Sequence, residues 1–217
     1  MKMGESSMPT VSGPAKRAIL IRDAFRLEWL SIAWMVIEGT VAIASGIIAH
    51  SVLLVAFGID SVIELASAGV LVWRLSVELQ HGREFSEATE RQAGRVAGGL
   101  LFVLALYVVV AAAVGLWRHA GAESSTSGIT LALAAIPIMY MLARRKLAVA
   151  QQLGSHALRA DAIESITCGW LSFVVVLGLG AQLALGAWWV DSLASLAIVY
   201  FLIREGREAW EGDKCCG

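Results

Sequence analysis

The chain has 217 residues, of which 58% are hydrophobic and 16% are charged, whereas about 25% are charged in an average soluble protein. This composition excludes an ordinary soluble globular protein and indicates an all-α integral membrane protein in a lipid bilayer. The formal net charge of −1 gives no reason to expect a nucleic-acid partner.

Six apolar segments, each close to the length that crosses a bilayer, predict six transmembrane helices in one domain. We expect a cytoplasmic N-terminal segment over 1–26, a six-helix transmembrane domain over 27–206 and a short cytoplasmic tail over 207–217. In chain order, the predicted spans are 28–49, 51–75, 95–117, 128–147, 157–180 and 187–206.

The 17 Lys and Arg residues divide very unevenly between the two sides of this arrangement. All of them except Arg118 fall on the side that holds both termini, and Lys146 is interpreted as part of the flank of the fourth span. Because basic residues concentrate in cytoplasmic loops, the sequence predicts both termini in the cytoplasm. The compact form fits a prokaryotic cytoplasmic membrane.

The second predicted span contains two acids, Asp60 and Glu64, in an otherwise apolar run. A charge near the bilayer centre costs about 2.5–3.5 kcal/mol on insertion scales, so such acids normally face a bundle interior and bind something. Their i to i+4 spacing puts both on one helix face, where they can share a cation. The alternative is a structural role, in which Ser or Thr side chains of neighbouring helices satisfy the two acids.

The fifth predicted span repeats this spacing with Glu164 and Cys168. Together the two helices offer three carboxylates and one thiol, a four-ligand set that suits a tetrahedral divalent metal. The sulfur favours zinc, cadmium or another soft ion over magnesium. Cys168 could instead be a small apolar packing residue, and Glu164 could be solvated near the cytoplasmic end of its span.

Three further acids lie in or at the ends of the predicted spans. Glu38 in the first span is expected to contact the metal ligands, to carry protons or to pack against another helix. Direct ligation of the metal is a further alternative. Asp161, close to Arg159, is interpreted as part of a salt-bridge set at the cytoplasmic interface. Asp191 is placed at the opposite interface, beside two tryptophans that suit an aromatic belt.

Small residues and the remaining cysteines complete the predictions. The spacing of Gly94 and Gly98 favours close packing within the bundle over a dedicated dimer seam. The vicinal pair Cys215 and Cys216 near the end of the chain could bind a soft metal or a thiol partner, or could be a dispensable polar end.

Parts of the chain resemble the cation diffusion facilitator family: 51–64 resembles its second helix, 159–168 its fifth, and 189–200 followed by 206–210 its sixth. The resemblance implies a six-helix cation-efflux bundle that exports zinc and similar divalent ions from the cytoplasm, usually in exchange for protons. It places the tetrahedral metal site at Asp60, Glu64, Glu164 and Cys168. Glu164 stands where the family usually has His, and Cys168 where it usually has Asp.

We therefore expect a proton-coupled exporter of divalent transition-metal cations, with zinc ahead of cadmium and other soft ions. The metal is the transported substrate, no prosthetic group is expected, and no second set of reactive side chains indicates an enzyme. The chain is expected to lack the family's C-terminal cytoplasmic domain, so a homodimer would form through membrane helices. The alternative is a membrane metal-binding adaptor or regulator that does not transport.

Overall fold

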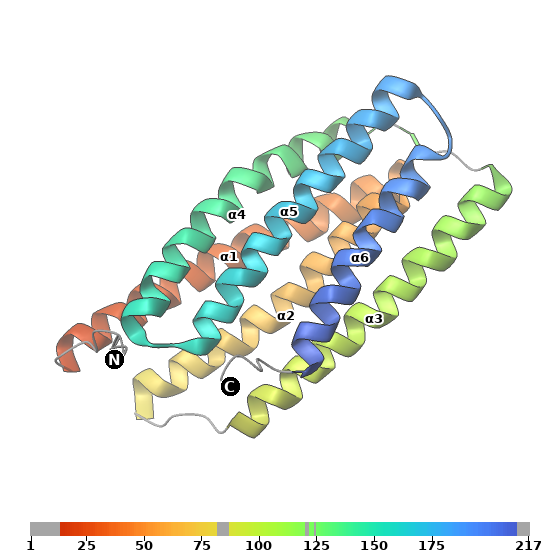
Figure 1. Cartoon of the computed structure of the whole chain (residues 1–217). Coiled ribbons are helices and arrows are strands. Elements are labelled where there is room, and N and C mark those ends of the chain that lie inside the picture. The colour runs from red at the N-terminus through yellow and green to blue at the C-terminus, as the bar shows by residue number, and fades with distance from the viewer. Residues whose placement is uncertain (1–13, 82–86, 120–121, 124, 212–217) are drawn as a thin grey trace, which may run out of the picture.

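The computed structural model describes residues 14–81, 87–119, 122–123 and 125–211, which form a bundle of antiparallel helices (Figure 1). The predicted all-α architecture is confirmed for this part of the chain. The predictions for Cys215 and Cys216 lie outside the described residues. The helices are α1 (Pro14–Ile48), α2 (Val52–His81), α3 (Glu87–Arg118), α4 (Thr126–Leu153), α5 (His156–Leu185) and α6 (Val190–Glu211).

The helices differ in how well they suit a membrane. Within the described ranges, α1 to α5 are long and apolar enough to cross a bilayer. The exception is α6, which carries Asp191 in its first turn and several charged residues toward its end, so the sixth membrane span stays a prediction. Large apolar side chains such as Ile48 and Trp117 are exposed on the outside of the bundle, as expected of a surface that faces lipid.

The six helices pair up in a way that brings distant parts of the sequence together. The most extensive packing joins α1 with α2, α3 with α6, and α4 with α5, while α2 also contacts α3, α5 and α6. The first turn of α1 and the last turn of α6 lie at the same end of the bundle (Figure 1). Helix α2 thus lies at the centre of the polar arrangement described below.

Glycines let α1 and α2 approach each other closely. A Cβ atom at Gly58 would lie only 2.9 Å from the backbone nitrogen of Ile43, and one at Gly46 only 2.8 Å from that of Val55. Small residues at such crossings allow backbones to touch, which is a main source of helix association in membranes. Glu38, next to Gly39 on α1, interacts electrostatically with Asp60 on α2 across this pair of helices.

Asp191 ties the start of α6 to the start of α2. Its carboxylate is buried and accepts hydrogen bonds from the Ser51 hydroxyl and, at 2.9 Å, from the backbone N–H of Val52. The Val52 N–H is one of the backbone donors that have no partner within a helix at its N-terminus. The predicted interfacial position of Asp191 therefore corresponds to a buried cap, and this acid is fully occupied by structural partners.

Candidate metal centre

Helix α2 directs Asp60 and Glu64 into the bundle. Their exposed fractions are 1% and 2%, and they continue a buried face that includes Phe57 and Ala68. The spacing of one helical turn places both side chains one above the other on that face. The neighbouring hydroxyl of Ser61 donates to the carbonyl of Phe57 at 3.2 Å, so this local donor serves the α2 backbone.

A third acid, Glu205 of α6, joins this pair. Each of Asp60, Glu64 and Glu205 offers a carboxylate oxygen, and these oxygens all lie within 4.8 Å of one another. We call these three residues the carboxylate group. Carboxylate oxygens at such separations can ligate one divalent cation.

The oxygens of this group lack ordinary partners. Among the described residues, no hydrogen bond reaches Asp60 Oδ1 or either carboxylate oxygen of Glu64, and all three atoms are buried. Desolvating a carboxylate without a compensating partner costs several kcal/mol, because its hydration is lost and nothing replaces it. A cation or bound protons would offset this cost.

Cys168 of α5 contacts Glu38 of α1. Its thiol is buried and donates a weak hydrogen bond to Glu38 Oε1, with 3.8 Å between the sulfur and the oxygen. Glu64 also interacts electrostatically with Cys168 and Glu38. Met35, Ala68 and Met139 form an apolar cluster with the cysteine. Glu38 Oε2 is buried and receives no hydrogen bond from the residues described.

Glu164 is half-buried on α5 and interacts electrostatically with Asp60. The structure therefore brings both predicted α5 residues near the predicted α2 pair, although neither belongs to the compact carboxylate group. Glu164 also interacts electrostatically with Asp161 and Lys146, which belong to a second group of charged residues.

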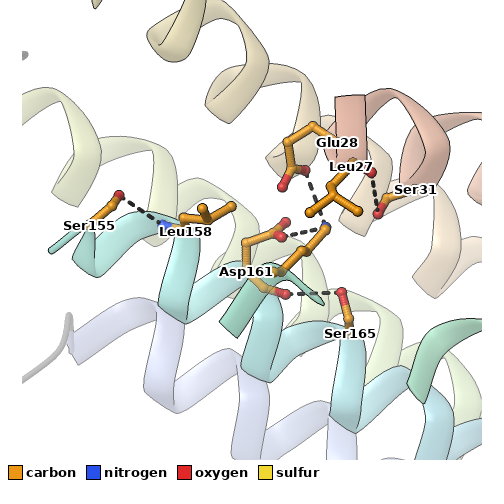
Figure 2. A network of polar contacts seen from close by, with 8 residues as sticks. Leu27, Glu28, Ser31, Ser155, Leu158, Asp161 and Ser165 are labelled. Carbon is orange, nitrogen blue, oxygen red and sulfur yellow. Dashed lines mark hydrogen bonds and ion pairs between the residues drawn. The ribbon is translucent and has the colours of Figure 1, made fainter. Parts of the chain in front are cut away.

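Glu28 of α1, Lys146 of α4 and Asp161 of α5 form a buried ion network, which we call the Lys146 triad. Figure 2 shows Glu28 and Asp161 directed toward each other. The Lys146 ammonium group donates to Asp161 and, at 3.2 Å, to Glu28. The side chain of Lys146 is fully buried. Figure 2 also shows Ser165 donating to the Asp161 carbonyl at 3.1 Å and Ser31 to the Leu27 carbonyl.

The structure corrects two interpretations made from the sequence at this network. Lys146 is not an exposed residue at the flank of its helix, because it is buried between three helices. Asp161 does form a salt bridge, but in the interior, and with Lys146 in place of Arg159, which is exposed. An interfacial pair would be screened by water, whereas this one is not.

Glu205 is the residue that the sequence interpretation missed. It stands between Arg204 and Arg207, and this run resembles a cytoplasmic flank. The structure shows the face to which it belongs, because the buried residues Asp191, Ser195, Ile198 and Leu202 recur at intervals of three or four. Continuing this period by three residues reaches Glu205 and places it on the inward face of α6.

A helical membrane bundle with partnerless carboxylates in its interior is the arrangement expected of an integral membrane transporter of cations. Comparison with known proteins agrees. Residues 29–211 match the family described as the cation efflux transmembrane domain. The chain therefore belongs to the cation efflux family, a family of membrane transporters.

One curated relative has a similar sequence. A protein of Synechocystis sp., described as an uncharacterized transporter, is 30% identical over 164 residues, which cover 73% of this chain and 53% of the relative. The chain thus spans about half the length of the curated relative that it matches.

Proposed function

We propose that the chain exports a divalent transition-metal cation, with zinc as the preferred ion, in exchange for protons. The observation that carries this proposal is the buried pair Asp60 and Glu64, three of whose carboxylate oxygens are buried and make no hydrogen bond with the described residues. A bundle that keeps such acids in its interior gains stability when a cation binds there.

The ligands proposed for the ion are Asp60, Glu64, Glu164 and Cys168. Three carboxylates and one thiol match the oxygen and sulfur ligands that zinc accepts, and the thiol favours zinc or cadmium over manganese or magnesium. The electrostatic interactions of Cys168 with Glu64 and of Glu164 with Asp60 support this set.

Proton coupling follows from the chemistry of these ligands. Carboxylates and thiols bind metals in their deprotonated forms, so metal binding releases protons and protons compete with the metal. An ion entering from the cytoplasm would displace protons, and protons entering from the other side would displace the ion. Outward transport is also consistent with termini in the cytoplasm, which the distribution of Lys and Arg predicts.

Metal flux into proteoliposomes with an imposed pH gradient tests this function. Zinc, cadmium and manganese are offered in turn to vesicles that contain the intact chain or Asp60→Asn, and an ionophore that collapses the gradient serves as a control. We expect zinc flux that follows the proton gradient and is abolished by Asp60→Asn. Tight metal binding without flux of any ion would indicate a metal-binding adaptor and reject transport.

A further inference from the structure

Helix α6 contributes an acid that the α2 and α5 ligand pairs do not include. We propose that Glu205 is a direct ligand of the transported cation, so that the ion is held by α6 as well as by α2 and α5. This inference rests on the proposed function, because it concerns the same ion. It adds a fourth carboxylate to the proposed ligands and a third helix to the machinery that must move when the ion is released.

Two independent observations support Glu205 as a ligand. Its carboxylate shares with Asp60 and Glu64 a cluster in which the ligand atoms are at most 4.8 Å apart. Separately, Asp60 Oδ1 and both oxygens of Glu64 are buried and receive no hydrogen bond from described residues, so the acids that face Glu205 still need a cation. Close acids without a basic partner repel one another unless a cation or a proton lies between them.

Packing explains why Glu205 faces inward. The adjacent Gly206 presses α6 against α3, where an added Cβ would lie 3.2 Å from the Gly98 carbonyl oxygen. This contact confirms the predicted close packing of Gly98 within the bundle. Side chains on either side of Glu205 turn outward: Arg204 and Glu208 are exposed and form a salt bridge at 2.9 Å. The nearest cation in sequence is therefore engaged with Glu208, and Glu205 remains with the α2 acids.

The matched pair Glu205→Gln and Glu208→Gln separates an inward acid from an outward one on the same helix. Zinc affinity is measured in detergent by competition with a fluorescent indicator. Loss of even an outer partner of a metal ligand costs about 10- to 100-fold in affinity, so we expect at least about a tenfold loss for Glu205→Gln. Glu208→Gln should bind zinc as the parent chain does. Equal affinity of the two variants would overturn the proposal.

A thiol at position 205 tests ligation directly. Glu205→Cys and Glu208→Cys are made with Cys215 and Cys216 changed to Ser, and cadmium is added while the ultraviolet sulfur-to-cadmium charge-transfer band is recorded. We expect a stronger band for Glu205→Cys than for Glu208→Cys. Equal bands would mean that Glu205 acts only through its charge, which overturns the ligand assignment. This measurement tests the assignment even if Glu205→Gln fails to fold.

The outcomes also separate this inference from the proposed function. Flux that requires Asp60 but is unchanged in Glu205→Gln would reject the α6 ligand and leave the transporter intact. Cadmium ligation at position 205 without flux of any metal by the parent chain would keep the ligand and reject transport.

Discussion

The bundle buries acids in two neighbouring regions that differ in one respect, the presence of a basic side chain. In the Lys146 triad, one ammonium group contacts both Glu28 and Asp161. In the carboxylate group, Asp60, Glu64 and Glu205 face one another, and no salt bridge from the described residues reaches them. A buried acid alone is therefore a weak reason to propose a binding site, and the missing counter-charge is what distinguishes the carboxylate group from the Lys146 triad.

Glu164 lies between the two regions and interacts with Asp60 on one side and with Lys146 and Asp161 on the other. The triad also joins α1, α4 and α5 close to the acids of α2. We interpret it as the fixed part of the polar interior, since its charges already have protein partners, while the carboxylate group is the part that exchanges a ligand. Four predictions test this division.

The largest effect is expected from Lys146→Met, which leaves Glu28 and Asp161 buried without their cation. Breaking a buried ion pair in this way costs about 3–5 kcal/mol. We expect this loss in the free energy of unfolding measured by denaturation in mixed micelles. Arg145→Met, which changes an exposed residue beside it, is the control. Unchanged stability of Lys146→Met would show that the triad is not an interdependent network.

The next effect is stabilisation by the metal itself. Zinc at about a hundred times its dissociation constant should stabilise the folded chain by about 2.7 kcal/mol, because it binds the folded state only. Asp60→Asn should lose this gain, while Arg145→Met should keep it. Thermal unfolding in detergent with and without zinc measures both, and equal stabilisation of Asp60→Asn would place the ion elsewhere.

Replacing an acid with methionine is expected to change the free energy of unfolding by a smaller amount, with opposite signs in the two regions. Glu64→Met removes two buried oxygens without partners, and leaving such a group unsatisfied costs about 1–3 kcal/mol, so the metal-free variant should be more stable than the parent. Glu28→Met removes a partner of Lys146 and should be less stable. The same sign for both variants in the denaturation experiment would contradict the division.

The smallest effect is expected at the surface of α6. Glu208→Gln breaks the exposed pair with Arg204, and exposed ion pairs contribute little to stability because water and salt screen them. We expect unfolding to be unchanged within the error of the same measurement. A clear loss would mean that this pair helps to hold Glu205 inward.

The sequence predicted the helices well because apolar runs of membrane length leave little choice of structure. It predicted their ends less well: α1 begins at Pro14 and α3 at Glu87, well before the predicted spans begin at 28 and 95. Hydropathy identifies only the apolar part of a helix, whereas the helix continues for as long as its backbone hydrogen bonds and local packing favour it.

For the candidate site, local spacing was sufficient for some acids and misleading for others. Asp60 and Glu64 stood out because both lie on one face within an apolar run. Glu205 and Lys146 were missed because charged neighbours in the sequence made each resemble a membrane flank. Only the packing of α6 on α3, and of α4 against α1 and α5, turns these two side chains inward.

The sequence by itself determined that this chain is a helical membrane protein and which face of α2 carries paired acids, because both depend on the composition and period of a single segment. The tertiary structure decided which buried acids have a counter-charge. That choice depends on partners far apart in the chain: Lys146 meets Glu28 across 118 positions. No local pattern encodes such a meeting, since it depends on how helices rotate and pack against one another.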